Sequence, residues 1–359
     1  MKEIFLLLLV PFILGGCYDY NGLNDLAIIS GIGIDYEEEE FKVTFEVIST
    51  KKEGDSSAPS STYYVTSTGE SIVYAFTSAA NQMDKVPYFE HVEMVVFSKD
   101  VAENHLEECI DYLIRTERLR NEFYTVIAED SAEELVTASS KDHPINSTYL
   151  VELLEFNSET FNSAYYSQFT KSVNSMLSDG EDAMMPVFKI KGEDTIELSG
   201  LGVFRDFQLV HIFDNDQASI INLLHNFNVE SVHFKRTCGE NQNIVIAIYR
   251  SDVAIQPSEN GILVSAVMSA RISESTCDYD LKKADTYTEL EKEFVKTIET
   301  KMDEVLRELQ AVQSNALNIG RIYYNQYRIK DFYSWTNQNI EYDINLKINK
   351  KGLTFEVNK

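Results

Sequence analysis

Basic residues are scarce in this sequence, and their scarcity excludes whole classes of function. The 359 residues include 31 lysines and arginines against 58 aspartates and glutamates, a formal net charge of −27. Proteins bind nucleic acids largely because their lysines and arginines release counterions from phosphates. Basic clusters likewise draw proteins to anionic membranes. We therefore expect no nucleic-acid partner and no membrane attachment through the overall charge.

Apolar runs of membrane-spanning length are also missing. The longest run covers residues 4–16, whereas a spanning helix needs about 20 residues. Lys2 precedes this run, and a basic start before a short apolar segment is typical of a secretory signal peptide. The run ends in the letters LGGC, which resemble the lipobox of bacterial lipoproteins. We predict that residues 1–16 are a signal peptide and that Cys17 is lipidated; the alternative is a plain signal peptide with an incidental cysteine.

Motifs of the common enzyme classes are absent from the sequence. It contains no G-x-x-x-x-G-K-[ST], no G-x-S-x-G and no H-E-x-x-H. Gly31-Ile32-Gly33 follows an apolar run, but it lacks the third glycine and the helix start that a dinucleotide site requires. The histidines are scattered without the spacing of metal ligands: His91, His105, His143, His211, His225 and His233. We expect a protein that is not an enzyme and that needs no metal or other cofactor.

Cysteine is rare as well, with four in the whole sequence. Cys109 lies among apolar residues at helical spacing, so we predict a buried thiol. Cys238 and Cys277 flank two apolar runs, between residues 243 and 272, that are typical of an antiparallel hairpin. A simple register puts these two cysteines on opposite faces, and a bulge at Gly239 would bring them together. A disulfide between them and two unrelated thiols both stay open.

The patterning of the first half predicts strands and helices in alternation. The apolar runs indicate strands over 26–35, 41–50, 91–98 and 121–130, the first two forming a hairpin. Ser67 and Glu70 have the spacing of a capping box before a helix, and a second, brief helix is expected over 131–140. Residues 141–182 are weakly patterned, which favours irregular structure or a small subdomain.

The second half has sharper signals. Strands are expected over 196–204 and 209–213, followed by a helix that begins at Asp214. Thr286 and Glu289 indicate a capping box for a long helix with an apolar stripe, and 339–348 alternates like a half-buried antiparallel strand. Burying both stripes needs a sheet covered by that helix. We predict an α+β fold of two or three domains with mixed or antiparallel sheets, divided into residues 17–190, with room for two subdomains, and residues 196–359.

The order of these segments resembles the Ger(x)C family, the lipoprotein C subunits of spore germinant receptors. The resemblance spans nearly the whole mature chain. Its matching blocks are CYDYNGLNDLAIISGIGID, PYFEHVEMVVFS, DYLIRTERLRNEFYTVIA and IELSGLGVFRDFQLVHIFDNDQASIINLLHN. The family has an Asp-rich segment with a glycine after the long helix, where this chain has ALNIGRIYYN, and a cysteine pair is not part of its pattern. For Arg115 and Arg120 in the third block we favour buried ion pairing over contact with a partner.

The resemblance implies a lipid-anchored, non-enzymatic subunit on the outer face of the spore inner membrane. Such a subunit assembles with an A subunit and an integral-membrane B subunit, and the complex triggers germination in response to nutrients. It also implies a chain built from three α+β domains. The alternative is an extracytoplasmic solute-binding lipoprotein, which would need two lobes of strand-helix-strand crossovers around a cleft, whereas this sequence indicates hairpins and one late long helix.

Overall fold

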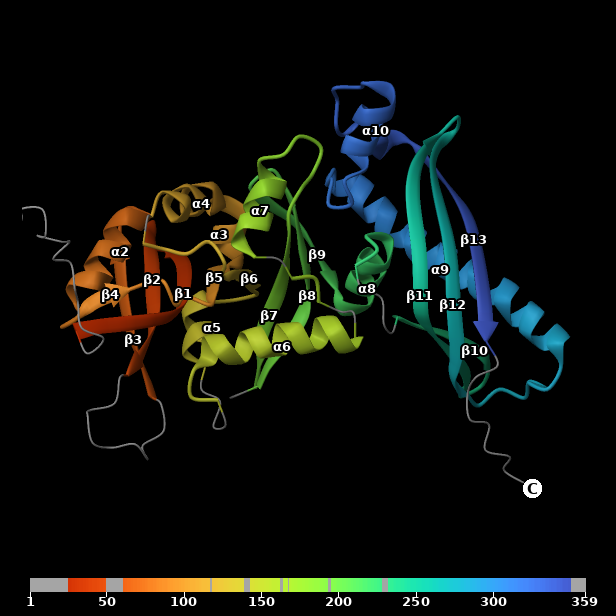
Figure 1. Ribbon diagram of the computed structural model, residues 1–359, viewed down its shortest axis with the longest axis horizontal. Helices are drawn as coiled ribbons and strands as arrows, with labels where there is room; N and C mark the ends of the chain where they lie inside the picture. Colours follow the sequence, from red (N-terminus) through yellow and green to blue (C-terminus); the bar gives the residue numbers. More distant parts are fainter. Residues whose placement is uncertain are drawn as a thin grey trace, which may run out of the picture.

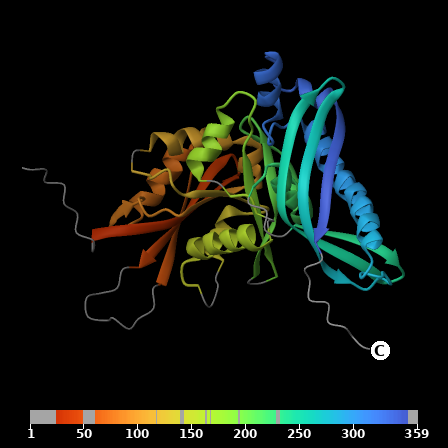
Figure 2. The same cartoon turned by 45° about the vertical axis from the view of Figure 1, so that its right-hand side comes forward.

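Two β-sheets, each packed against helices, make up the protein (Figure 1). The structure is a computed structural model and describes residues 25–49, 61–116, 118–138, 143–161, 164–166, 168–192, 195–227 and 232–349. The sheets follow one another along the long axis of the molecule, and the chain completes the first before it begins the second (Figures 1 and 2). This mixture of helices and two sheets confirms the predicted α+β class. The predicted signal peptide and Cys17 lie outside the described residues.

The first sheet combines hairpins with parallel strands. Its path is β3-β2-β1-β5-β6-β7-β8-β9, and β4 pairs with the start of β1. The pairs β1–β5, β5–β6 and β6–β7 are parallel and the other pairs along the path are antiparallel, so this is a mixed sheet, one of the two kinds that the sequence predicted. The strands are β1 (Leu26–Glu37), β2 (Glu40–Ser49), β3 (Ser61–Gly69), β4 (Val86–Tyr88), β5 (Met94–Ser98), β6 (Tyr124–Ala128), β7 (Met184–Lys191), β8 (Thr195–Arg205) and β9 (Gln208–Asp214).

Helices cover both faces of the first sheet. One face packs against α2 (Ile72–Asn81), α3 (Lys99–Asn104), α4 (Leu106–Arg115) and α7 (Phe169–Met176). The other face packs against α5 (Ala132–Thr137) and α6 (Asn146–Phe161). Because both faces are covered, side chains that alternation alone would place in solvent are buried, among them Thr44 and Glu46 of β2.

The helix α6 corrects the expectation of irregular structure over residues 141–182. Its N-terminus is fixed by the buried Glu46 carboxylate, which accepts hydrogen bonds from the backbone amides of Asn146 at 2.6 Å and Ser147 at 3.0 Å. The Ser30 hydroxyl donates to the same carboxylate at 3.0 Å. A carboxylate at this position satisfies free amides of the first helical turn and favours the helix dipole. The helix is therefore specified by a residue 100 positions away as well as by its own sequence.

The second sheet has the order β10-β11-β12-β13. Its strands are β10 (Val232–Gly239), β11 (Gln242–Ser258), β12 (Gly261–Ser275) and β13 (Asn339–Asn349). The predicted hairpin of β11 and β12 is confirmed. Its register is not simple: Ile248 pairs with Ala270, and the register shifts between Val245 and Ile246 and again between Ile248 and Arg250. The prediction of an antiparallel last strand is wrong, because β13 runs parallel to β12. The chain crosses back along the sheet through a long helix before β13 begins, which gives the two strands the same direction.

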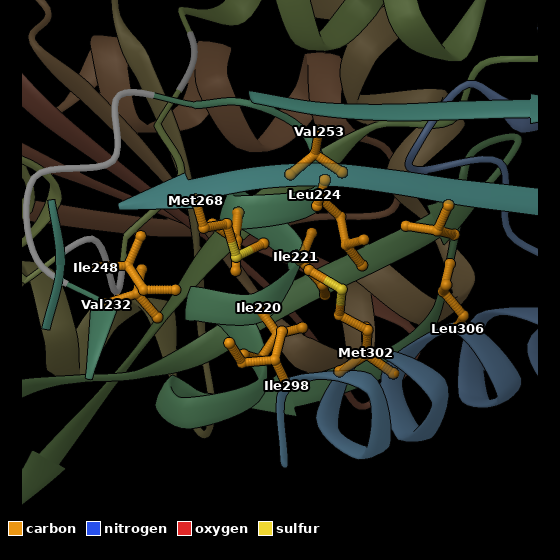
Figure 3. Close-up of a cluster of buried hydrophobic side chains, with 14 of the residues drawn as sticks. Ile220, Ile221, Leu224, Val232, Ile248, Val253, Met268, Ile298, Met302 and Leu306 are labelled. Carbon is orange, nitrogen blue, oxygen red and sulfur yellow. The ribbon is translucent and has the colours of Figure 1, made fainter. Parts of the chain in front are cut away.

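That long helix, α9 (Ala284–Val312), buries its predicted apolar stripe against the second sheet. Ile298 and Met302 point from α9 toward Ile220, Ile221 and the strands (Figure 3). The remaining elements of this half are α8 (Asn215–Leu224), α10 (Ile319–Tyr327) and a 3-10 helix, η2 (Ser334–Asn337). A helix that covers one face of a sheet buries both the apolar stripe of α9 and the apolar residues that alternate along β13, as predicted.

Two predicted helix caps are wrong. Ser67 belongs to β3, which pairs with β2 as far as Gly69, so the cap of α2 is Ser71 instead. The helix α9 begins at Ala284 without a side-chain cap, which places Thr286 inside its first turn. The helix predicted to begin at Asp214 is confirmed as α8, and Asp214 caps it, with its carboxylate accepting a hydrogen bond from the Gln217 amide at 2.9 Å.

The predicted division of the chain near residues 190–196 falls inside the first sheet. The strands β7 and β8, one from each side of this division, pair along most of their length. The boundary between two domains at residues 190–196 stays a prediction. The second sheet begins later in the chain, at Val232.

Candidate functional site: the junction between the two sheets

Buried hydrogen bonds join the half of the molecule that is built on the first sheet to the half that is built on the second sheet. In the part of the chain that the structure describes, no group of three or more histidine, cysteine or acidic side chains is placed to hold a metal ion. No helix among these residues combines the length and apolarity needed to cross a bilayer. The contacts that join the two halves form the candidate site.

Asp182 is the centre of this junction. It lies between α7 and β7 and is almost fully buried, with 5% of its surface exposed. One carboxylate oxygen accepts a hydrogen bond from the Asn315 amide at 2.5 Å, and the other accepts from the Asp206 amide at 3.1 Å. The Asp182 amide donates in return to the Asn315 carbonyl at 3.3 Å. This one residue thus connects the turn between β8 and β9 to the segment that follows α9.

Asn315 extends the network into the second half. Its side-chain oxygen accepts hydrogen bonds from the Gly320 amide at 3.0 Å and from the indole nitrogen of Trp335 at 2.8 Å. Trp335 is the sole tryptophan and is fully buried. The neighbouring Ser314 hydroxyl donates to the Phe204 carbonyl at 2.6 Å. Buried polar groups that are satisfied in this way fix one arrangement of the segments that carry them.

Two glycines allow the backbones to meet closely at the junction. Gly180 has a φ of +74°, and a Cβ placed there would lie 2.7 Å from the Arg321 amide nitrogen. A Cβ on Gly320 would lie 2.1 Å from the Phe332 carbonyl oxygen. The Arg321 guanidinium also pairs with Glu181 at 2.8 Å. A larger residue at position 180 would push its segment away from Arg321, and one at position 320 would push α10 away from Phe332.

Burial shifts the pKa values of ionisable groups at the junction. Removal from water raises the pKa of Asp182 to about 6, although the two backbone amides oppose the shift by stabilising the carboxylate. The Asp206 charge raises this pKa further and the Arg205 charge lowers it. Burial, with the nearby Asp182 charge, also raises the pKa of Tyr333 to about 12. The arrangement holds a carboxylate whose charge state changes in mildly acidic conditions, and it offers no nucleophile beside a base.

The structure places the three described cysteines in two settings. Cys109 is a free thiol buried in the core, as predicted, and burial raises its pKa. Cys238 and Cys277 are joined by a disulfide with their Cα atoms 6.1 Å apart. The bond spans β11, because Asn243 pairs with Thr237 on one side and its carbonyl accepts from the Thr276 amide on the other. The register is irregular between Thr237 and Gly239, at the position where the sequence suggested a bulge.

Arg115 and Arg120 correct the expectation of buried ion pairs. Their side chains are 75% and 65% exposed. Arg115 pairs with Asp111 one helical turn earlier at 2.8 Å, and Arg120 lies 3.7 Å from Glu90. Both carboxylates are also exposed, so these arginines do not hold the core together and remain available to a partner.

The sequence did not reveal the junction residues. Asp182 and Asn315 are 133 positions apart, and neither lies in a recognisable motif. The signals present were indirect: a lone tryptophan, and glycines beside polar residues at 180–182 and 318–320.

Comparison with known proteins connects this architecture to spore germination. The model of a family described as "Spore germination protein N-terminal domain" matches residues 19–190, and that of "Spore germination B3/GerAC like, C-terminal" matches residues 199–352. The chain is 21% identical to spore germination protein KC of Bacillus subtilis (strain 168), over 98% of this chain and 93% of the relative. It is 22% identical to spore germination protein A3 of the same organism, over 44% and 43%.

A solved structure has the same fold. The crystal structure of the GerBC protein matches 91% of this chain and 99% of its own, with a TM-score of 0.56 and 16% identity. The two family matches cover both halves of the chain and meet near the predicted division between them. On these matches, the chain belongs to the Ger(x)C family of spore germination proteins.

Proposed function

We propose that this protein is the lipid-anchored C subunit of a spore nutrient germinant receptor. It is attached through Cys17 to the outer face of the spore inner membrane, after removal of residues 1–16. There it assembles with an A subunit and an integral-membrane B subunit, and the complex triggers germination. It works by binding and positioning its partners, without catalysis.

The proposal rests on one combination: the chain matches spore germination families, and a lipoprotein-like cysteine precedes the matched region. Both halves of the chain match spore germination families. Residues 14–17, shortly before the first family match begins at residue 19, read LGGC, with the cysteine at the position of a lipoprotein anchor. Two acyl chains are what stable anchoring to a bilayer generally requires, and a diacylglyceryl group on Cys17 would supply them.

The junction gives a structural reason for a scaffolding role. Asp182 and Asn315 join the first half to the segment after α9 through two hydrogen bonds, and the Ser314 hydroxyl adds a third to the Phe204 carbonyl, so surfaces on the two halves are held in fixed relation. Exposed Arg115 and Arg120 lie on the first half, where charged side chains free of the core can meet a partner. A subunit that contacts two membrane proteins benefits from such rigidity.

The test is purification of the assembled complex from spore membranes. A tagged copy of this chain, extracted in mild detergent, is expected to bring down one A-type and one B-type receptor subunit. Deletion of the gene is expected to slow optical-density loss after nutrient addition, while germination that bypasses the receptors stays normal. Isolation of the chain without membrane subunits, together with a full nutrient response in the deletion strain, would refute the proposal. A thermal shift with amino acids or sugars would instead favour a solute-binding lipoprotein.

A further inference from the structure

The segment after the long helix has an unusual charge for this protein. Residues 309–330 contain no aspartate or glutamate, although these two acids make up 58 of the 359 residues. The same stretch contains three basic residues, Arg321, Arg328 and Lys330. An acid-free stretch that carries cations stands out against a net charge of −27.

The structure exposes the basic end of this stretch. The helix α10 projects beyond the end of the second sheet, as both views show (Figures 1 and 2). The residues from 325 to 331 are all exposed, where the helix ends and the chain turns. Tyr327 and Ile329 are among them, with 46% and 38% of their surfaces in solvent. Because these two side chains lie two residues apart on one exposed stretch, a surface that met this tip would contact both of them.

The cations at this tip have different roles. Arg321 is occupied at the junction, where it pairs with Glu181 at 2.8 Å. The Arg328 guanidinium lies 5.6 Å from the centre of the Tyr324 ring. Within the described ranges, neither Arg328 nor Lys330 has a carboxylate within 4.0 Å. Two cations therefore alternate with two exposed apolar side chains over residues 327–330, the letters YRIK.

We propose that the YRIK segment, Tyr327 to Lys330, docks onto an anionic lipid surface. Tyrosine is favoured at the level of lipid headgroups, where its ring is buried and its hydroxyl stays hydrated. Arginine and lysine beside it bind the phosphates of anionic lipids, and Ile329 adds apolar contact. The inference rests on the proposed attachment of the chain to a membrane, and it adds a second, protein-made contact to the lipid on Cys17.

The shape and charge of the segment favour a lipid surface over an acidic protein. Tyr327 and Ile329 belong to the end of α10 and the turn after it, which project from the molecule (Figure 1). Exposed apolar side chains at such a tip can insert into a lipid bilayer. Repulsion between the remaining charge of the chain and an anionic bilayer would turn the acidic surfaces away and leave this tip as the part that faces the lipid. A contact of two cations and two apolar side chains is much weaker than two acyl chains, but it is strong enough to be detected on anionic vesicles. In the lipidated protein it orients a chain that the acyl groups already hold near the membrane.

The test uses the unlipidated chain from Tyr18 onward, which contains every described element, and synthetic vesicles. Flotation with vesicles of phosphatidylglycerol and phosphatidylcholine in equal parts is compared with flotation on pure phosphatidylcholine. The double variant Arg328→Glu/Lys330→Glu removes the cations, and Lys292→Glu/Lys296→Glu on the exposed side of α9 makes the same charge change elsewhere. A third variant, Tyr327→Ser/Ile329→Ser, removes the apolar contact. Thermal unfolding midpoints of all variants check that the fold is intact.

We expect the parent chain to bind only the anionic vesicles. Reversal of Arg328 and Lys330 should weaken that binding at least about tenfold, since each cation near such a surface is worth about 1 kcal/mol. The α9 variant should bind within about twofold of the parent. Equal losses in both charge variants, or no vesicle binding by the parent, would overturn the inference and leave an acidic protein as the occupant. Because the assay contains neither lipidated Cys17 nor receptor subunits, its failure would not bear on the proposed function.

Discussion

The buried carboxylate of Asp182 accepts a hydrogen bond from the backbone amide of Asn315 at 2.5 Å, across 133 residues of sequence. The two residues belong to different halves of the molecule, so this contact and its neighbours set how the halves are held. Its strength depends on the charge of a group that is costly to bury. The junction is accordingly the place where pH and substitution should affect the coupling of the halves most clearly.

Asp182 should make stability depend on pH in mildly acidic solution. Its pKa in the folded protein is about 6, above the ordinary value of 3.8, so the folded state binds this proton more tightly than the unfolded state. The free energy of unfolding should therefore fall as the pH rises from about 4 to about 6, by up to about 3 kcal/mol from this group. Asp182→Asn should remove that part of the pH dependence. Denaturant unfolding at pH values from 4 to 7 measures the difference, and parallel curves for the two proteins would contradict the prediction.

Asn315→Ala should loosen the second half. The substitution deprives the buried Gly320 amide and Trp335 indole of their acceptor, at a cost of about 2 to 4 kcal/mol. Because Trp335 is the sole tryptophan, its fluorescence reports this region directly. Asn325→Ala, at an exposed position on α10, is the matched control and should leave the unfolding midpoint unchanged. Equal midpoints for the parent and Asn315→Ala would show that the network carries no stability.

If the chain is exported as proposed, the disulfide between Cys238 and Cys277 is expected to form in the mature protein. It closes a loop of 39 residues, which should stabilise the second sheet by roughly 3 to 4 kcal/mol. Mass spectrometry of unreduced, alkylated protein should show the two cysteines linked and Cys109 unmodified until denaturation. Cys238→Ser/Cys277→Ser should lower the unfolding midpoint. Two alkylated thiols in protein taken from the spore envelope would contradict the expectation.

Arg115 and Arg120 should matter for partners and little for folding. Both are largely exposed, and exposed ion pairs contribute about 0 to 1 kcal/mol. Arg115→Ala and Arg120→Ala should each change the free energy of unfolding by less than about 0.5 kcal/mol. Recovery of receptor subunits with the tagged chain measures their role in assembly. A large loss of stability in either variant would argue for a structural role instead.

Elements with a strong local period could be predicted from the sequence. The alternation from Phe41 to Val47 predicts β2 and its hairpin with β1, and the stripe from Leu290 to Leu309 predicts the buried face of α9. Both patterns repeat within the element itself. The helix start at Asp214 was equally local, since the Gln217 amide that Asp214 caps is three positions away.

Features set by distant residues could not be predicted. The helix α6 buries serines and receives its N-terminal acceptor from Glu46, so its own pattern is weak. The direction of β13 depends on the path of the chain through α9 and α10, which its alternation does not contain. The Asp182–Asn315 contact requires both halves to be folded before its residues can meet. Propensity and period are local quantities, and these features are not.

Fractionation of spores that carry Cys17→Ala tests the proposed lipid anchor and the receptor role together. We expect the unlipidated protein to be depleted from the inner membrane, because the net charge of −27 cannot hold it there and a weak contact at YRIK cannot replace two acyl chains. In the same spores we expect slower optical-density loss after nutrient addition and normal germination by routes that bypass the receptors. A full complement of Cys17→Ala protein in the membrane, with an unchanged nutrient response, would refute both the anchor and the receptor role.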